Sequence, residues 1–152
     1  MRVLILMTLW ASPAIALSQP SVNSGSKPKA TVTTLDTASA RQVPSGKAKI
    51  KILAQGENAF VGQLWLAAGG AVPVHRDPTE EYIYVVSGSG KITIDGRTTE
   101  IGPGATVYMP ANAEVSFKNG EQPLVAIQIF AGTESAKKYD RWAPITKAKS
   151  RP

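Results

Sequence analysis

The residues best suited to chemistry lie in one stretch of the chain, from Gly70 to Gly88. This stretch contains the only histidine, His75, and three acidic residues that follow it closely, Asp77, Glu80 and Glu81. Of these groups, His75, Asp77 and Glu81 are the three that could act together. One imidazole and two carboxylates can bind Fe(II) or Mn(II), although the usual three-ligand oxygenase set has two histidines and one carboxylate. The same groups can instead hydrogen-bond one another, or a small molecule, without any metal. The residue types leave both options open.

Strand geometry would allow these three side chains to meet. His75 and Asp77 are two positions apart, so in an extended segment they share one face. The run YIYVV that follows predicts a strand, and Glu81 would lie on its inward face with Ile83 and Val85. The outward positions would be taken by Tyr82 and Tyr84.

Other catalytic chemistries find little support in the sequence. The chain has no cysteine, which excludes disulfides, thiolate metal sites and a cysteine nucleophile. The glycine-serine pattern at 88–90 lacks the lysine and the strand–helix context of a phosphate loop. A serine hydrolase would need an oxyanion motif, and the sequence has none. Glu80 and Glu81 are adjacent on a strand and would point to opposite faces, so they are a poor pair for glycoside hydrolysis.

Short strands and turns alternate from about residue 47 to residue 132. Lys47 to Leu53 alternates charged and apolar residues, which predicts a half-buried strand. Asp95-Gly96 is typical of a two-residue hairpin turn, and Gly102 to Gly104 predicts another turn. Many short strands with glycine and proline between them are typical of an all-β sandwich or barrel. The sequence therefore predicts one all-β domain.

The segment from about Lys47 to Gly132 resembles a cupin, a small jelly-roll barrel that is also described as a double-stranded β-helix. The first cupin motif is matched in order by Gly70, His75, Asp77, Glu81 and Gly88. The second motif is matched by Gly104, Pro110 and Asn119. The resemblance covers a little over half of the chain and implies a cupin-like barrel as the fold.

The same resemblance indicates which metal ligands have been replaced. Metal-binding cupins use two histidines and a glutamate of the first motif and one histidine of the second. Here Asp77 occupies the place of the second histidine, and Val115 occupies the place of the fourth ligand. The resemblance thus implies a site of at most His75, Asp77 and Glu81, which holds either no cofactor or one divalent metal, Fe, Mn, Ni or Zn. The same three residues are the candidates for binding a small-molecule ligand, and no catalytic residue is assigned.

The N-terminal residues predict export. Met1 and Arg2 precede a compact apolar run, and Ala14 and Ala16 supply the small residues that a signal peptidase needs. The apolar run is too short to cross a bilayer, which takes about 20 residues. We therefore interpret residues 1–16 as a signal peptide, so that the mature chain would be secreted or periplasmic, with no membrane span after cleavage.

The rest of the chain divides into a linker, the barrel and a tail. Residues 17–46 predict a linker rich in serine, proline and lysine, with an edge strand at Thr31 to Leu35. Residues 47–132 form the predicted barrel. Residues 133–152 form a basic C-terminal tail, in which Ser135 to Trp142 would make one turn of helix.

The net charge of +6 would suit an acidic partner, but its distribution argues against nucleic acid. Residues 47–131 carry seven basic and eight acidic side chains, whereas residues 132–152 carry six basic and two acidic. A nucleic-acid-binding protein normally presents a basic face with a recognition element, and the sequence shows neither. We expect solvated basic tails and no nucleic-acid partner.

The sequence favours an exported cupin-like barrel that binds a small molecule at a degenerate metal site. Two alternatives stay open. The first is a divalent-metal-dependent enzyme, of dioxygenase or isomerase type, that uses His75, Asp77 and Glu81. The second is a structural or interaction module, in which Thr31–Leu35 or Lys47–Leu53 would supply the edge of a homodimer. Neither the ligand nor enzymatic activity follows from the sequence, because a fold does not imply a function.

Overall fold

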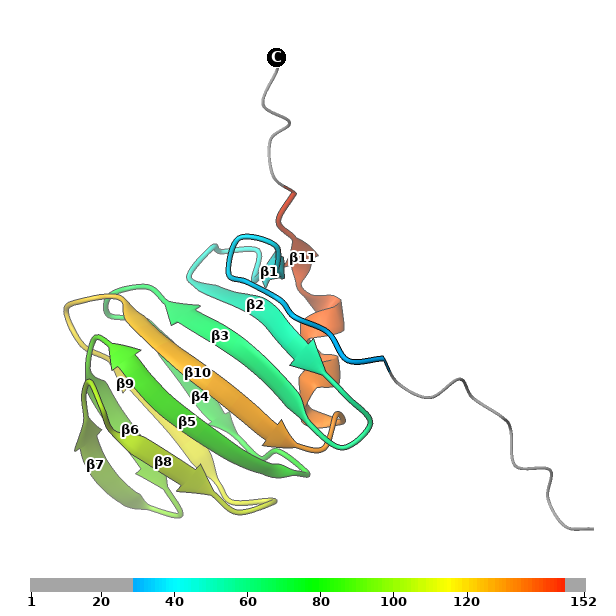
Figure 1. Cartoon of the computed structure of the whole chain (residues 1–152). Helices are drawn as coiled ribbons and strands as arrows, with labels where there is room; N and C mark the ends of the chain where they lie inside the picture. Colours follow the sequence, from blue (N-terminus) through cyan, green and yellow to red (C-terminus); the bar gives the residue numbers. More distant parts are fainter. Residues whose placement is uncertain (1–28, 147–152) are drawn as a thin grey trace, which may run out of the picture.

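The computed structural model describes residues 29–146. The predicted signal peptide and part of the predicted linker lie outside these described residues. The described chain is built mainly from β-strands, with one short 3-10 helix near its C-terminal end (Figure 1). Among the described residues, no helix is long and apolar enough to cross a lipid bilayer.

Eleven strands and one helix make up the described part of the chain. The strands are β1 (Ser39–Gln42), β2 (Ala48–Gln55), β3 (Phe60–Leu66), β4 (Ala71–His75), β5 (Glu80–Ser87), β6 (Gly90–Ile94), β7 (Arg97–Ile101), β8 (Thr106–Met109), β9 (Val115–Asn119), β10 (Leu124–Ala131) and β11 (Ala143–Pro144). The helix is η1 (Ser135–Arg141).

The strands form two antiparallel sheets. The larger sheet has the order β11-β1-β2-β3-β10-β5-β8, and the smaller sheet has the order β4-β9-β6-β7. Strands that pair are often far apart in the chain, as β3 and β10 are in the larger sheet and β4 and β9 in the smaller one. The predicted all-β jelly-roll barrel is confirmed.

The main core lies between the two sheets. Ile83 and Val85 on β5 belong to one buried cluster with Val115 and Phe117 on β9, which is part of the other sheet. Each strand contributes alternate residues to this core because successive side chains point to opposite faces. The predicted faces of β5 are confirmed by the buried residues Glu81, Ile83 and Val85 and by the exposed residues Tyr82 and Tyr84.

The helix η1 lies beside the larger sheet (Figure 1), and a second, smaller core joins the two. Ala136 and Tyr139 of η1 pack with Phe60 of β3 and Phe130 of β10. The ring centroid of Phe60 lies 5.9 Å from that of Phe130 and 5.6 Å from that of Tyr139. The segment that the sequence marks as a basic tail therefore begins with a helix packed against the barrel.

The N-terminal edge of the larger sheet differs from the prediction. No strand forms at Thr31–Leu35, and β1 pairs with β2 and β11 instead. Thr34 and Thr37 hydrogen-bond each other through backbone and side chain, and Ala38 N donates to Thr34 O at 2.9 Å. Such local bonds offer the backbone an alternative to a strand. Because β2 lies between β1 and β3, Lys47–Leu53 is not a free edge either, and a homodimer stays a prediction without an assigned surface.

Two turn glycines illustrate different demands on the backbone. Asp95 and Gly96 have φ values of 46° and 79° and join β6 to β7 as the predicted two-residue turn. Gly88, between β5 and β6, has a φ of 80°. A Cβ at Gly88 would lie 2.4 Å from the carbonyl oxygen of Pro123, whereas a Cβ at Gly96 would have nothing within 4 Å.

We expect Gly88→Ala to lower the free energy of unfolding by more than Gly96→Ala does. Both substitutions place an alanine at positive φ, which costs about 1–3 kcal/mol, but only Gly88→Ala adds a clash with backbone. Chemical denaturation of the two variants measures the difference. If both variants lose the same free energy of unfolding, the backbone at Pro123 must move away from the new methyl group without an energetic cost.

Candidate functional site

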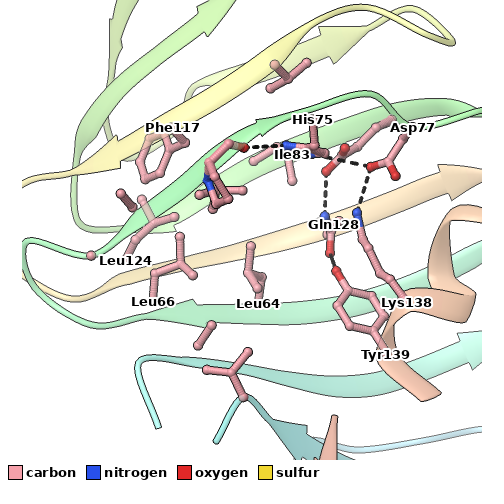
Figure 2. Close-up of a pocket in the computed structure, with 18 of the residues that line it drawn as sticks. Leu64, Leu66, His75, Asp77, Ile83, Phe117, Leu124, Gln128, Lys138 and Tyr139 are labelled. Atoms are coloured by element: carbon pink, nitrogen blue, oxygen red, sulfur yellow. Dashed lines mark hydrogen bonds and ion pairs between the residues drawn. The ribbon is translucent and has the colours of Figure 1, made fainter. Parts of the chain in front are cut away.

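A cavity of about 600 Å³ extends into the barrel. Much of its wall is apolar and comes from both sheets, as with Leu64, Leu66, Ile83, Phe117 and Leu124. Polar residues gather where η1 meets the barrel (Figure 2): His75, Asp77, Gln128, Lys138 and Tyr139. The cavity therefore has a largely apolar body and a polar end, and Ser45 and Lys47, between β1 and β2, also line it.

The structure brings the three site residues expected from the sequence together at this polar end. His75 ends β4, Asp77 lies in the following loop, and Glu81 lies near the start of β5. One donor atom from each residue lies within 4.8 Å of the other two, and His75 Nε2 is 3.6 Å from Asp77 Oδ2. Metal–ligand bonds of about 2.1 Å allow two atoms at such a distance to share one ion. The His75–Asp77 pair meets this limit, whereas atoms as far apart as 4.8 Å would have to approach to about 4.2 Å to share the ion. One nitrogen and two carboxylate oxygens are a donor set that a divalent metal accepts.

A proline on an edge strand orients the histidine. β4 is an edge of the smaller sheet, where Pro73 is tolerated although it cannot donate to the sheet. His75 Nδ1 lies 2.9 Å from Pro73 O, and since a carbonyl only accepts, Nδ1 carries the proton of this bond. Nε2 is then the ring nitrogen that faces Asp77. Metal-binding histidines normally have this orientation.

The loop that carries Asp77 is tied to the turn between β8 and β9. Asn112 N donates to Asp77 O at 2.7 Å, and Arg76 Nη1 donates to Asn112 O at 2.6 Å. Arg76 also forms an ion pair with Glu114 at 3.0 Å. These contacts fix the backbone at Asp77.

Glu81 is the buried acid of the site. It is 6% exposed, and Gln128 Nε2 donates to its Oε1 at 2.5 Å. Burial removes water from the carboxylate and raises the pKa of Glu81 above its ordinary value, while the Gln128 hydrogen bond and the charge of Lys138 act in the opposite direction. Glu81 therefore keeps its proton to a higher pH than an exposed glutamate does.

Two further residues reach the polar end from η1. Lys138 Nζ is 2.7 Å from Asp77 Oδ2, and the Tyr139 hydroxyl donates to Gln128 Oε1 (Figure 2). Burial raises the pKa of Tyr139 well above its ordinary value, so its hydroxyl stays protonated. Because Gln128 gives its oxygen to Tyr139, its amide nitrogen is directed to Glu81.

Three residues of the polar end, Gln128, Lys138 and Tyr139, were not expected from the sequence. Gln128 could have been found from the alternation of β10, because it is the only polar residue at the buried positions of that strand. No sequence pattern indicates Lys138 and Tyr139, since their role depends on contacts with residues far away in the chain. Lys138 and Asp77, for example, are 61 positions apart.

Val115 lines the cavity where the family has its fourth ligand. It is opposite His75 in the pairing of β9 with β4, and its side chain is buried. Its isopropyl group has no donor atom. The candidate ligand set therefore ends at three residues, and this side of the polar end is apolar.

We expect Glu81→Gln to raise the melting temperature at neutral pH. Because burial raises the pKa of Glu81 in the folded chain, ionising it costs stability, and this cost appears as the pH rises from about 4.5 through the folded pKa. Below about pH 4.5 both folded and unfolded chains bind the proton, so the gain should disappear there. Thermal melts across this range, with exposed Glu100→Gln as the control, measure the effect. A gain of equal size at acidic and neutral pH would contradict this explanation.

Two sequence comparisons agree with this architecture. The cupin domain family matches residues 64–130. The chain is also similar to the uncharacterized protein SCO3923 of Streptomyces coelicolor, with 30% identity over 101 residues, which are 66% of this chain and 95% of that protein.

Solved structures share the fold at low sequence identity. An RmlC-like cupin from Shewanella frigidimarina has a TM-score of 0.63 and 16% identity, covering 68% of this chain and 92% of its own. KdgF from Halomonas sp. has a TM-score of 0.63 and 17% identity, with coverages of 68% and 94%. The polyketide cyclase RemF from Streptomyces resistomycificus has a TM-score of 0.61 and 18% identity, with coverages of 80% and 89%. Sequence match, fold and motif positions together show that this chain belongs to the cupin superfamily.

Proposed function

We propose that this chain is an exported cupin that binds a small molecule in its barrel cavity. The observation that carries the proposal is the division of the cavity into an apolar body and a polar end. Its volume of about 600 Å³ is in the range of small-molecule sites, which combine apolar walls with a few placed polar groups. Support for export comes from the N-terminal sequence.

The lining favours a ligand with an apolar body and a polar group at the end where His75 and Asp77 lie. Leu66, Phe117 and Leu124 offer no hydrogen bonds through their side chains, so a ligand that is polar throughout would lose its hydration there without compensation. At the other end, Asp77 and Lys138 offer an acceptor and a donor side by side. A hydroxyl or carbonyl group at one end of an aliphatic or ring-shaped molecule matches this arrangement.

A divalent metal is the cofactor that the polar end would hold. His75, Asp77 and Glu81 would be its ligands, and the ion would supply a Lewis acid next to the polar group of the bound molecule. The chain itself orients His75 through Pro73, orients Glu81 through Gln128, and provides an apolar wall for the body of the bound molecule. The convergence of the three donors supports a second candidate function, a metal-dependent enzyme of dioxygenase or isomerase type.

We expect the chain to bind the fluorophore anilinonaphthalene sulfonate saturably, with its apolar rings in the body of the cavity and its anionic sulfonate at the polar end. Val115→Phe places a ring in the cavity and should weaken binding by at least about tenfold, which corresponds to about 1.4 kcal/mol. Val74→Phe is the matched control, because Val74 is 65% exposed. Fluorescence titration of the three proteins, with melting curves to show that each is folded, makes the comparison. A wild-type chain without saturable binding, or equal weakening by both substitutions, would count against the proposal.

The metal ligand set has its own test. Val115→His adds a donor opposite His75 and should raise the affinity for Ni(II) or Zn(II) by at least about tenfold, because imidazole suits both ions. Val74→His, on the same strand as His75 but exposed, is the matched control. Calorimetric titration of untagged protein measures both, and His75→Ala should abolish the gain. If Val115→His binds no better than Val74→His, the three donors do not surround a common point.

A further inference from the structure

One carboxylate oxygen of Asp77 lies close to two nitrogen atoms, one from a lysine and one from the histidine of the candidate metal site. Asp77 Oδ2 accepts from Lys138 Nζ at 2.7 Å, and the same oxygen is 3.6 Å from His75 Nε2 (Figure 2). A metal shared by His75 and Asp77 would need this oxygen or a rotated carboxylate. The ammonium group of Lys138 therefore stands at the atom through which the metal would be bound.

The surroundings of Lys138 hold it in this place. Its ammonium lies 4.7 Å from the ring centroid of Phe130 and 5.8 Å from that of Tyr139, and such contacts attract a cation to a ring face. The helix that carries it is fixed at its start, where Ser135 Oγ and Thr79 Oγ1 are 2.6 Å apart. The packing of η1 and the two aromatic rings thus hold the Lys138 ammonium next to Asp77.

The next lysine on the same helix provides a contrast. Lys137 has a side chain that is 68% exposed, and it pairs with Glu134 at 3.7 Å on the surface. The side chains of Lys138 and Asp77 are 27% and 15% exposed. Charges shielded from water in this way interact more strongly than charges on the surface.

We propose that Lys138 is a built-in competitor for the metal, and that its ion pair with Asp77 must open before a divalent ion binds to His75, Asp77 and Glu81. The proposal rests on the metal site of the proposed function. It follows from charge and from geometry together. A divalent ion would be repelled by the ammonium, and it would need either the oxygen that the ammonium uses or a rotation of the carboxylate that breaks the ion pair. The C-terminal helix of this cupin thereby sets how readily the barrel takes up metal.

Removal of the ammonium group tests the competition. Metal-free, untagged full chain is titrated with Mn(II), Ni(II) and Zn(II) by calorimetry, as wild type, Lys138→Met, Lys138→Arg and Lys137→Met. Lys138→Met should bind at least about tenfold more tightly than wild type, whereas Lys138→Arg, which keeps the charge, and Lys137→Met should stay within about threefold of it. Unchanged or weaker binding by Lys138→Met, an equal gain in Lys137→Met, or no binding by any variant would overturn the proposal.

A second measurement uses the wild-type chain and does not depend on how the variants fold. Limited acetylation of lysines is quantified by mass spectrometry without and with saturating metal. Metal should raise the labelling of Lys138 at least about threefold relative to Lys137, because the amine loses its carboxylate partner, and a chelator should reverse the change. Equal labelling of Lys138 in both states would overturn the competition.

The fluorophore titration separates this proposal from the proposed small-molecule function. The fluorophore is titrated into the wild-type chain and into Lys137→Met, which changes no residue that lines the cavity and should bind within about threefold of wild type. If fluorophore binding is absent while the metal competition holds, only the small-molecule proposal fails. If fluorophore binding holds while Lys138→Met gains no metal affinity, only the competition fails.

Discussion

Glu81 lies on the inner face of β5 with Ile83 and Val85, and it cannot leave this face without carrying both apolar residues into solvent, because a shift by one residue exchanges the two faces of a strand. A buried carboxyl group costs free energy unless it is hydrogen-bonded. Gln128 supplies the hydrogen bond from β10, and Tyr139 holds Gln128 in the orientation required. The polar end of the cavity is organised around this one buried acid.

The C-terminal helix joins the packing of the barrel to the chemistry of the site. Tyr139 belongs to the smaller core with Phe60 and Phe130, and its hydroxyl is also part of the hydrogen-bond chain to Glu81. The next residue toward the N-terminus, Lys138, pairs with Asp77. By the positions of the cupin motifs, aspartate and valine stand where two metal-binding histidines would be. A lysine from outside the barrel, Lys138, pairs with that aspartate. A shared fold therefore leaves the chemistry of the site undecided.

Much of the barrel could be predicted from local patterns. Alternation along β5 predicted which residues face inward, and Asp95-Gly96 predicted the turn from β6 to β7, because both features depend on residues close in the chain. The edge strand was wrong at Thr31–Leu35, where β-branched residues favour a strand but Thr34 and Thr37 close a turn on themselves. Propensity is a weak guide where side chains can bond the nearby backbone.

The sequence by itself determined the barrel class and the group of His75, Asp77 and Glu81, because strand periodicity and motif spacing are local properties. Only the tertiary structure decided what surrounds that group. Lys138 reaches Asp77 across 61 positions, and its pairing depends on how η1 packs against β3 and β10. A contact of this kind leaves no periodic trace in the chain, since it is set by the packing of whole elements and not by the spacing of neighbouring residues.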